Sequence, residues 1–125
     1  MDDTNLPVNC GEIFFKIMKT DLSILKPIEK IPGFHGKFIH GAGFTIALWE
    51  VKAGSILPEH SHIHEQSSQV TSGKFELTID GNTEVYEPGM IAVVPSNSVH
   101  SGRAITDCTI TDIFCPSRPE YSNYE

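Results

Sequence analysis

The chain has 125 residues and a mass of 13.8 kDa, which is enough for one domain with its own hydrophobic core. Its formal net charge is -7 and its 9 Lys and Arg residues are dispersed, so a nucleic-acid surface is not expected. No apolar run approaches the roughly 20 residues of a membrane span, which argues against a membrane role.

The cysteines indicate a reducing compartment. Cys10, Cys108 and Cys115 are odd in number, far apart and without a CxxC pair, so they predict neither a disulfide framework nor a thiolate metal site. The first residues, MDDTNLPVNC, are acidic where a signal peptide is basic. We therefore expect a cytoplasmic protein with free thiols.

The first third of the chain carries weak patterns. Residues 12–18 could form a strand, and residues 21–29 could form a turn of helix that Pro27 cuts short. We expect N-terminal peripheral strands and a connector over residues 1–35.

From residue 44 onward the pattern is that of short strands with turns between them. Residues 74–80 (KFELTID) alternate most regularly, and the Asp-Gly-Asn that begins at Asp80 is a hairpin signal. Further strands are expected, with Gly, Pro and Asn turns between them, at 44–51, 83–86, 91–94 and 108–114. This spacing predicts an all-β sandwich or barrel.

A histidine-rich segment, HSHIHEQ (residues 60–66), could carry metal ligands. Side chains at positions i and i+2 of an extended segment point the same way, so His60 and His62 share a face. Gln66 joins that face if the strand stays extended, whereas Glu65 points to the opposite side. Two histidines of this kind are equally consistent with a solvated loop, and a further lone histidine, His100, is by itself more often structural.

Taken together, residues 54–73 and 89–100 resemble the paired motifs of the cupin family. The first reads glycine, five residues, HxH, three residues, an acidic or amide position, six residues and glycine; the second reads glycine, five residues, proline and a histidine further on. The resemblance implies a double-stranded β-helix or jelly-roll barrel, expected over residues 36–118. It also implies that one divalent metal ion is held by four side chains: His60, His62, Gln66 and His100.

Three positions depart from the cupin pattern. Gln66 stands where glutamate is usual, Asn97 where glycine is usual, and Ala104 where asparagine is usual. With three neutral imidazoles and a neutral amide, the ion would keep its full charge, which favours Lewis-acid chemistry over stabilisation of an oxidised metal. A nitrogen and oxygen ligand set without sulfur suits Ni, Zn, Fe, Mn or Cu.

A narrower resemblance includes the run DIFCPSR at residues 112–118. Together with HSHIHEQ and SGKFELTIDG, it is similar to the small pectin-degradation cupins, which open unsaturated uronic acids. The resemblance implies three active-site residues, Asp112, Phe114 and Arg118. It implies ring opening of 4,5-unsaturated uronic acid monosaccharides to linear keto-uronates, an isomerase-type reaction in which Asp112 moves protons and Arg118 holds the substrate carboxylate.

The residues themselves leave alternatives open. Asp112 shares one face of its strand with Ile110 and Phe114, so it is either a hydrogen-bonded structural group or a tuned acid or base. Arg118 is either a surface charge near a frayed tail or a clamp for a carboxylate. A C-terminal tail is expected over residues 119–125. Trp49 and Phe114 could line a sugar pocket, although aromatic residues on the strands of a small barrel are usually core.

Two other functions are compatible with a cupin: a quercetinase-like dioxygenase, and a metal-dependent sugar-binding module without turnover. For the proposed enzyme we expect a small anionic sugar as substrate, and a homodimer paired through outer strands, as is common for cupins of this size. Ser67, Ser68 and Gln69 are expected to make the pocket wall polar. The remaining histidines are expected to be structural or solvent-exposed: His35, His40 and His64.

Overall fold

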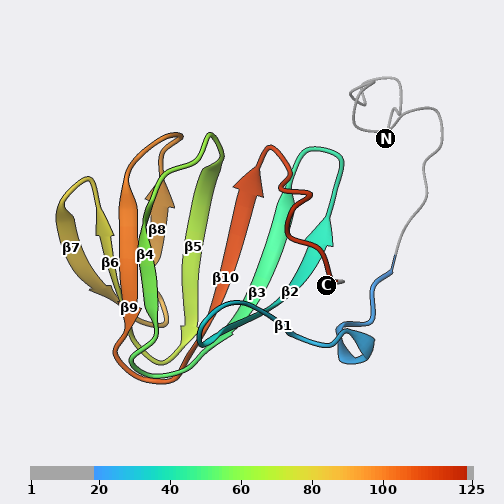
Figure 1. Cartoon of the computed structure of the whole chain (residues 1–125), viewed down its shortest axis with the longest axis horizontal. Coiled ribbons are helices and arrows are strands. Elements are labelled where there is room, and N and C mark those ends of the chain that lie inside the picture. The colour runs from blue at the N-terminus through green and yellow to red at the C-terminus, as the bar shows by residue number, and fades with distance from the viewer. Residues whose placement is uncertain (1–18, 124–125) are drawn as a thin grey trace.

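The computed structural model describes residues 19–123, which fold into two antiparallel β-sheets (Figure 1). The elements are a short 3-10 helix and a series of strands, in the order η2 (Leu22–Ile24), β1 (Ile28–Ile31), β2 (Phe34–His40), β3 (Thr45–Val51), β4 (Ile56–His60), β5 (Glu65–Ser72), β6 (Phe75–Ile79), β7 (Asn82–Tyr86), β8 (Ile91–Val94), β9 (His100–Ala104) and β10 (Cys108–Cys115). One sheet has six strands in the order β1-β2-β3-β10-β5-β8, and the other has four in the order β4-β9-β6-β7. Within residues 19–123, no helix has the length and apolar character that crossing a membrane requires.

Strand β10 lies at the centre of the larger sheet. It pairs with β3 on one side and β5 on the other, so that Asp112 lies opposite Ala47 and Ser68. Successive side chains of a strand point to opposite faces, and β10 alternates buried with less buried residues along its whole length. Ile110, Asp112 and Phe114 therefore all face the interior, as their alternation in the sequence predicts.

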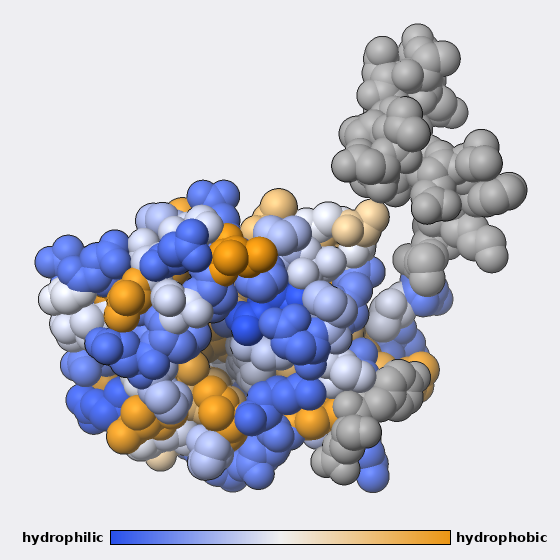
Figure 2. All heavy atoms as spheres, turned by 45° about the horizontal axis from the view of Figure 1, so that its top comes forward, coloured by the Kyte–Doolittle hydropathy of each residue, from blue (hydrophilic) through white to orange (hydrophobic). Residues whose placement is uncertain are grey.

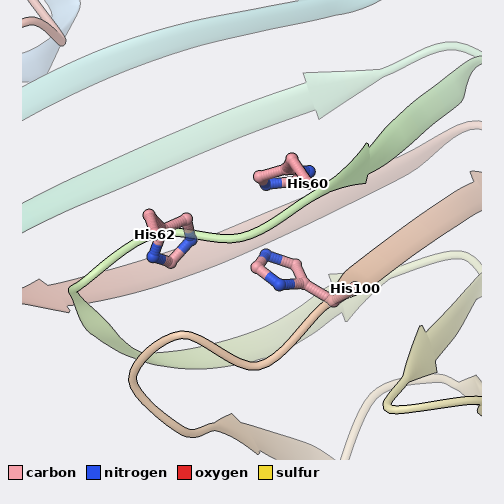
Figure 3. A group of neighbouring side chains, drawn as sticks. All are labelled: His60, His62 and His100. Atoms are coloured by element: carbon pink, nitrogen blue, oxygen red, sulfur yellow. The ribbon is translucent and has the colours of Figure 1, made fainter.

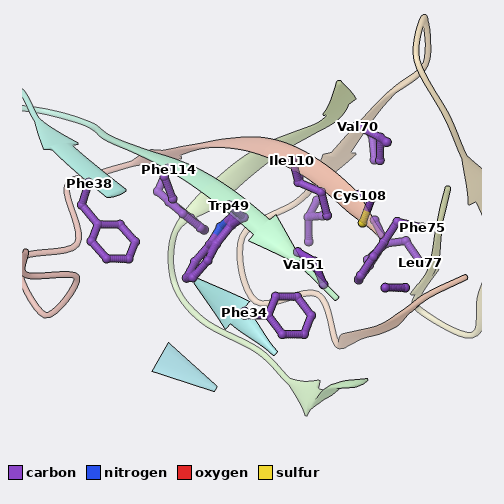
Figure 4. Packing of buried hydrophobic residues seen from close by; sticks show 14 residues of the cluster. Phe34, Phe38, Trp49, Val51, Val70, Phe75, Leu77, Cys108, Ile110 and Phe114 are labelled. Carbon is purple, nitrogen blue, oxygen red and sulfur yellow. The ribbon is translucent and has the colours of Figure 1, made fainter. Parts of the chain in front are cut away.

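The core lies between the two sheets and is rich in aromatic rings (Figure 4). Phe34 of β2 contacts Trp49 of β3 and Phe75 of β6, with ring centroids 6.2 and 6.1 Å apart and nearly perpendicular planes. Edge-to-face pairs of this kind are favoured by the charge distribution of the rings. Because β6 belongs to the smaller sheet, these contacts join the two layers. The two-layer, all-β architecture confirms the predicted jelly-roll barrel.

The hairpin predicted from the strand at residues 74–80 and the turn signal at Asp80 is confirmed. Strands β6 and β7 pair from Phe75 opposite Tyr86 to Ile79 opposite Asn82. Asp80 and Gly81 have φ angles of 48° and 84°, the left-handed values that a two-residue type I′ turn requires. The strands predicted at residues 44–51, 91–94 and 108–114 also agree with β3, β8 and β10 to within one residue.

The sequence patterns do not predict the strands that surround the histidines, β4, β5 and β9. Strand β5, with the sequence EQSSQVTS, looks like a polar loop, yet it is paired on both sides, with β10 and with β8, in the larger sheet. Its inward residues include Gln66 and Ser68, which face a cavity instead of the apolar core. Because these inward positions of β5 carry polar residues, its sequence lacks the apolar alternation from which a strand is predicted.

The boundary expected at residue 35 falls inside β2. This strand pairs along its whole length with β3, from Phe34 opposite Val51 to His40 opposite Thr45, so β1 and β2 extend the larger sheet. Residues 21–29 form the 3-10 helix η2 and the start of β1, while the strand expected at residues 12–18 and Cys10 lie outside the described residues.

The C-terminal tail packs against β2 over the residues that the structure describes, so the frayed tail of the alternative view of Arg118 is not observed there. Tyr121 stacks on Phe38 with ring centroids 5.0 Å apart. The Asn123 side chain donates to the Phe38 carbonyl at 2.7 Å and accepts from the Phe38 N–H at 2.9 Å, as a neighbouring strand would. We call residues 116–123 the strap, because this segment is fastened across β2.

Gly36 of β2 lies beneath the aromatic cluster. A Cβ at this position would lie 2.6 Å from the ring of Phe38 and 2.8 Å from the ring of Trp49, and these rings already pack against each other with centroids 5.3 Å apart. We predict that Gly36→Ala lowers the free energy of unfolding by about 1–3 kcal/mol, measured by denaturant titration. Gly43→Ala, whose Cβ meets nothing within 4 Å, should change it by less than about 0.5 kcal/mol; equal effects would contradict the described packing.

Candidate metal centre

Three histidines from two neighbouring strands and a loop meet at one end of the barrel. His60 is the last residue of β4, His62 lies in the following loop, and His100 is the first residue of β9, directly opposite His60. The ring centroids are 4.2 Å apart for His60 and His100, 4.9 Å for His62 and His100, and 5.6 Å for His60 and His62. Figure 3 shows the three imidazoles gathered around one space, and one nitrogen from each lies within 4.8 Å of the others, so they could hold a metal ion.

Each of the three rings is oriented by a hydrogen bond to a backbone carbonyl two residues away. The Nδ1 to oxygen distances are 2.7 Å for His60 to Pro58, 3.0 Å for His62 to His64, and 2.9 Å for His100 to Ser98. A carbonyl oxygen can only accept, so the hydrogen resides on Nδ1 and the lone pair on Nε2. Hydrogen bonds of this kind are typical of metal-binding histidines, because they select the tautomer and hold the ring.

Burial keeps two of these imidazoles neutral. The Nε2 atoms of His62 and His100 are buried and have no hydrogen-bond partner among residues 19–123. Burial lowers the pKa of His62 to about 4, and it also lowers the pKa of His100. At neutral pH both rings therefore offer an unprotonated nitrogen, which is the form that binds a metal. The three-histidine cluster fits an ion, since an ion would satisfy nitrogens that are otherwise left without a partner.

Gln66, the fourth expected ligand, reaches the same cavity by a different route from the one predicted. The chain does not stay extended from His60 onward, because β4 ends at His60 and β5 begins only at Glu65. The alternation within β5 itself turns Gln66 inward, where it is 7% exposed. Its Oε1 is buried without a hydrogen-bond partner in the described part of the chain, which fits an amide oxygen facing a cation.

The turn before His100 holds the loop that carries His62. The N–H of Asn97 donates to the carbonyl of His62 at 2.7 Å, and the hydroxyl of Ser96 donates to the carbonyl of Ile63. Asn97 has a φ of 65°, in the left-handed region that asparagine tolerates better than most residues with a side chain. This conformation explains why asparagine can take a position where cupins usually have glycine.

Asp112 lies deep in the cavity and is 8% exposed. The indole N–H of Trp49 donates to Asp112 Oδ2 at 3.1 Å, whereas Oδ1 is buried with no hydrogen-bond partner among the described residues. Burial raises the pKa of Asp112 to about 6, although the neighbouring side chains of Ser68 and Gln66 act in the opposite direction. A carboxyl group with such a pKa can both accept and return a proton near neutral pH.

Arg118 is held in place by four neighbours and is not a free surface charge. Its guanidinium carbon lies 4.8 Å from the ring centre of Phe114 and 4.2 Å from that of Tyr121. Its Nε donates to Glu120 at 3.0 Å, and its backbone N–H donates to the Thr45 hydroxyl at 2.7 Å. The side chain is 13% exposed. The two terminal nitrogens make no hydrogen bond within residues 19–123, so they can receive a second anion.

His60, Gln66, His100, Asp112 and Arg118 line one cavity of about 40 Å³, which has room for little more than one water molecule. Its polar lining consists of His60, Gln66, Ser68, His100, Asp112 and Arg118, with Phe114 and Tyr121 beside them. Figure 2, in which the top of Figure 1 is turned forward, shows a recess near the centre of the molecule bordered largely by hydrophilic residues. Of the three polar residues expected to form the wall after Gln66, only Ser68 lines the cavity.

Sequence reasoning misses the hydrogen bond from Trp49 and the contributions of His64 and Tyr121. Trp49, expected either in the core or on the pocket wall, is buried in the core, lines the cavity and donates through its indole N–H to Asp112. His64 is buried, with 9% exposed, and its backbone carbonyl accepts the hydrogen bond that orients His62. Its role is therefore structural, as expected. Tyr121 lines the cavity from the strap. No local pattern marks these roles, because each depends on contacts between residues that are distant in the sequence or on a backbone atom.

Comparison with known proteins gives the same architecture. A family model described as a cupin domain matches residues 47–114. KdgF from Halomonas sp. has a TM-score of 0.73 and 25% identity, and the match covers 77% of this chain and 90% of that one. An RmlC-like cupin from Shewanella frigidimarina has a TM-score of 0.80 and 20% identity, with 86% and 97% covered. No curated protein matches the sequence.

A larger enzyme contains the same architecture as part of its chain. The salicylate 1,2-dioxygenase from Pseudaminobacter salicylatoxidans has a TM-score of 0.65 and 20% identity, and the match covers 70% of this chain and 28% of that one. At this identity, the likeness to the dioxygenase and to the RmlC-like cupin describes the fold alone.

The Asn97 turn gives a test of how His62 is positioned. Asn97→Val places a β-branched residue in the left-handed region, which costs about 1–3 kcal/mol, so we predict a displaced turn and a zinc affinity weakened by about tenfold or more. Asn97→Gly, which adopts the same φ without strain, should retain wild-type affinity. Titration with zinc by calorimetry measures both; equal affinity for the Val and Gly variants would show that the turn does not position His62.

Proposed function

This chain belongs to the cupin family, and on that premise we propose that it is a metal-dependent enzyme that opens 4,5-unsaturated uronic acid monosaccharides to linear keto-uronates. The observation that carries the proposal is the meeting of three groups at one cavity: a histidine cluster of which His60 and His100 line the cavity, the buried carboxyl of Asp112, and the guanidinium of Arg118. His60, His62, His100 and Gln66 would hold the ion. When bound, the ion would supply Lewis-acid chemistry at a substrate oxygen.

The charge of the site favours an anionic substrate. The proposed ligands are three neutral imidazoles and a neutral amide, so none of them cancels the charge of a divalent ion. The terminal nitrogens of Arg118 add donors in a planar arrangement that matches a carboxylate. Glu120 already occupies Nε of Arg118 and so leaves the other edge of the guanidinium for the substrate. A sugar acid fits this arrangement better than a neutral sugar.

Asp112 is proposed to move the proton. In the substrate, C1 carries a hydroxyl group and the ring oxygen joins C1 to the unsaturated C5. Ionised Asp112 takes the proton of the C1 hydroxyl, and the bond between C1 and the ring oxygen breaks as the C1 carbonyl forms. Asp112 then delivers the proton to C4 while a carbonyl forms at C5. The product is an isomer of the substrate, so no oxidant, reductant or added water is required.

The surroundings of Asp112 suit this role. Trp49 holds Oδ2 through its indole N–H, which leaves Oδ1 as the oxygen that exchanges the proton. Its pKa of about 6 means that the carboxyl is mainly ionised at pH 7, while its conjugate acid is strong enough to protonate carbon. The resemblance of residues 112–118 to the pectin-degradation cupins supports the same assignment.

Loss of ultraviolet absorbance by the unsaturated uronate measures the reaction, because ring opening removes the conjugated double bond. We predict that metal-loaded wild-type protein accelerates this loss and that Asp112→Asn lowers kcat by about 10²–10⁴-fold, since an amide cannot carry the proton. The metal content should stay unchanged. Asp107→Asn, which alters a carboxylate that binds the Ala53 N–H outside the cavity, should keep wild-type activity.

Each alternative has its own outcome in these assays. Tight binding of the uronate with no product would contradict the enzyme and select a sugar-binding module. Oxygen consumption with flavonols, without activity on uronates, would select a dioxygenase. Full activity of Asp112→Asn would leave the ring opening intact but remove the proposed proton carrier.

A further inference from the structure

Tyr121 is a cavity residue that the proposed reaction does not yet use. Its ring stacks on Phe38 and makes edge contacts with Trp49 and Phe114, each with centroids 5.6 Å apart. The guanidinium of Arg118 also lies over the ring, 4.2 Å from its centre. Tyr121 is thus enclosed on several sides, yet it borders the same cavity as Asp112.

The strap holds Tyr121 in this position through its backbone. The Tyr121 carbonyl accepts a hydrogen bond from His40 Nε2 at 2.8 Å, and Nδ1 of the same ring contacts the Thr45 hydroxyl at 2.7 Å. The Thr45 hydroxyl also accepts from the Arg118 N–H. One buried threonine and one histidine therefore fix Arg118 and Tyr121 relative to each other. The orientation of the phenol is set before any ligand arrives.

The hydroxyl of Tyr121 is left free by this packing. It makes no hydrogen bond to any residue between 19 and 123, while the ring contacts Phe38 and the Arg118 guanidinium. Burial raises the pKa of the Tyr121 phenol, and the charges of Arg118 and Asp112 are near enough to shift it in opposite directions. The phenol therefore keeps its proton at neutral pH and can act as a donor.

The size of the cavity places the body of a sugar against the strap. A volume of about 40 Å³ accommodates an ion or a water molecule but not a hexuronate ring. Only the reacting edge of the substrate can reach the histidines and Asp112, so the rest must lie against the groups that border the cavity. On the strap these are Arg118 and Tyr121.

We propose that Tyr121 is a substrate-binding residue, which donates a hydrogen bond from its hydroxyl to the sugar acid beside the carboxylate held by Arg118. This inference rests on the proposed function and deepens it, because it assigns a second donor that recognises the sugar acid. The isosteric Tyr121→Phe keeps the stacking of the ring and removes only the donor. A matched control is Tyr86→Phe, since Tyr86 of β7 is partly buried against the core and does not line the cavity.

The chain contains 1 tryptophan, so its fluorescence reports on the cavity through the hydrogen bond from Trp49 to Asp112. The probe for binding is galacturonate, a saturated uronic acid that the proposed reaction cannot consume, titrated into zinc-loaded protein. We expect Tyr121→Phe to raise the Kd of galacturonate and the KM of the unsaturated uronate by about threefold to tenfold. We expect kcat, zinc content and melting temperature to stay unchanged, because the substitution removes a binding contact and leaves the reaction and the fold intact. Tyr86→Phe should match the wild type.

The outcomes separate this inference from the proposed function. If the wild type converts the unsaturated uronate and Tyr121→Phe has the same Kd and KM, the hydroxyl is not a substrate contact and Tyr121 serves packing alone. If the wild type neither binds galacturonate nor converts the unsaturated uronate, the proposed function fails and the inference falls with it.

Discussion

Hydrogen bonds from three histidine Nδ1 atoms to backbone carbonyls orient the side chains that we propose as metal ligands. Because each carbonyl belongs to a residue two positions away, the backbone that forms the end of β4, the following loop and the start of β9 also sets the tautomer of each ring. His62 lies in a loop outside any strand. The Asn97 turn holds this loop through a hydrogen bond to the His62 carbonyl. With these bonds in place, one nitrogen of each ring lies within 4.8 Å of the others.

Burial connects the histidine cluster to the rest of the cavity. Loss of solvent around the ionisable groups lowers the pKa of His62 and His100 and raises the pKa of Asp112 to about 6. Trp49 contributes both to the aromatic core and to the position of Asp112, so the packing of the barrel and the chemistry of the site are not separable. The strap completes the enclosure by bringing the only cavity-lining cation described, Arg118, against Phe114.

The sequence predicts the barrel and the members of the site better than it predicts how they meet. Regular alternation and the Asp80 turn identify β6 and β7, and the paired motifs identify the histidines. Strand β5 is not predicted, because its inward residues Gln66 and Ser68 are polar side chains that line the cavity. Gln66 is predicted on the assumption of a continuous extended segment, whereas β4 ends at His60 and β5 begins only at Glu65. Tyr121 is missed because its importance comes from long-range contacts with Phe38 and Trp49, which no local pattern records.

The central claim is that neutral side chains from β4, its following loop, β5 and β9 hold a single ion at their meeting point. An anomalous difference map from a zinc-loaded crystal, recorded on either side of the zinc absorption edge, tests it most directly. We predict one peak, about 2.0–2.2 Å from Nε2 of His60, His62 and His100 and from the amide oxygen of Gln66. A map with no peak between the three rings, or with zinc bound elsewhere on the chain, would contradict the account.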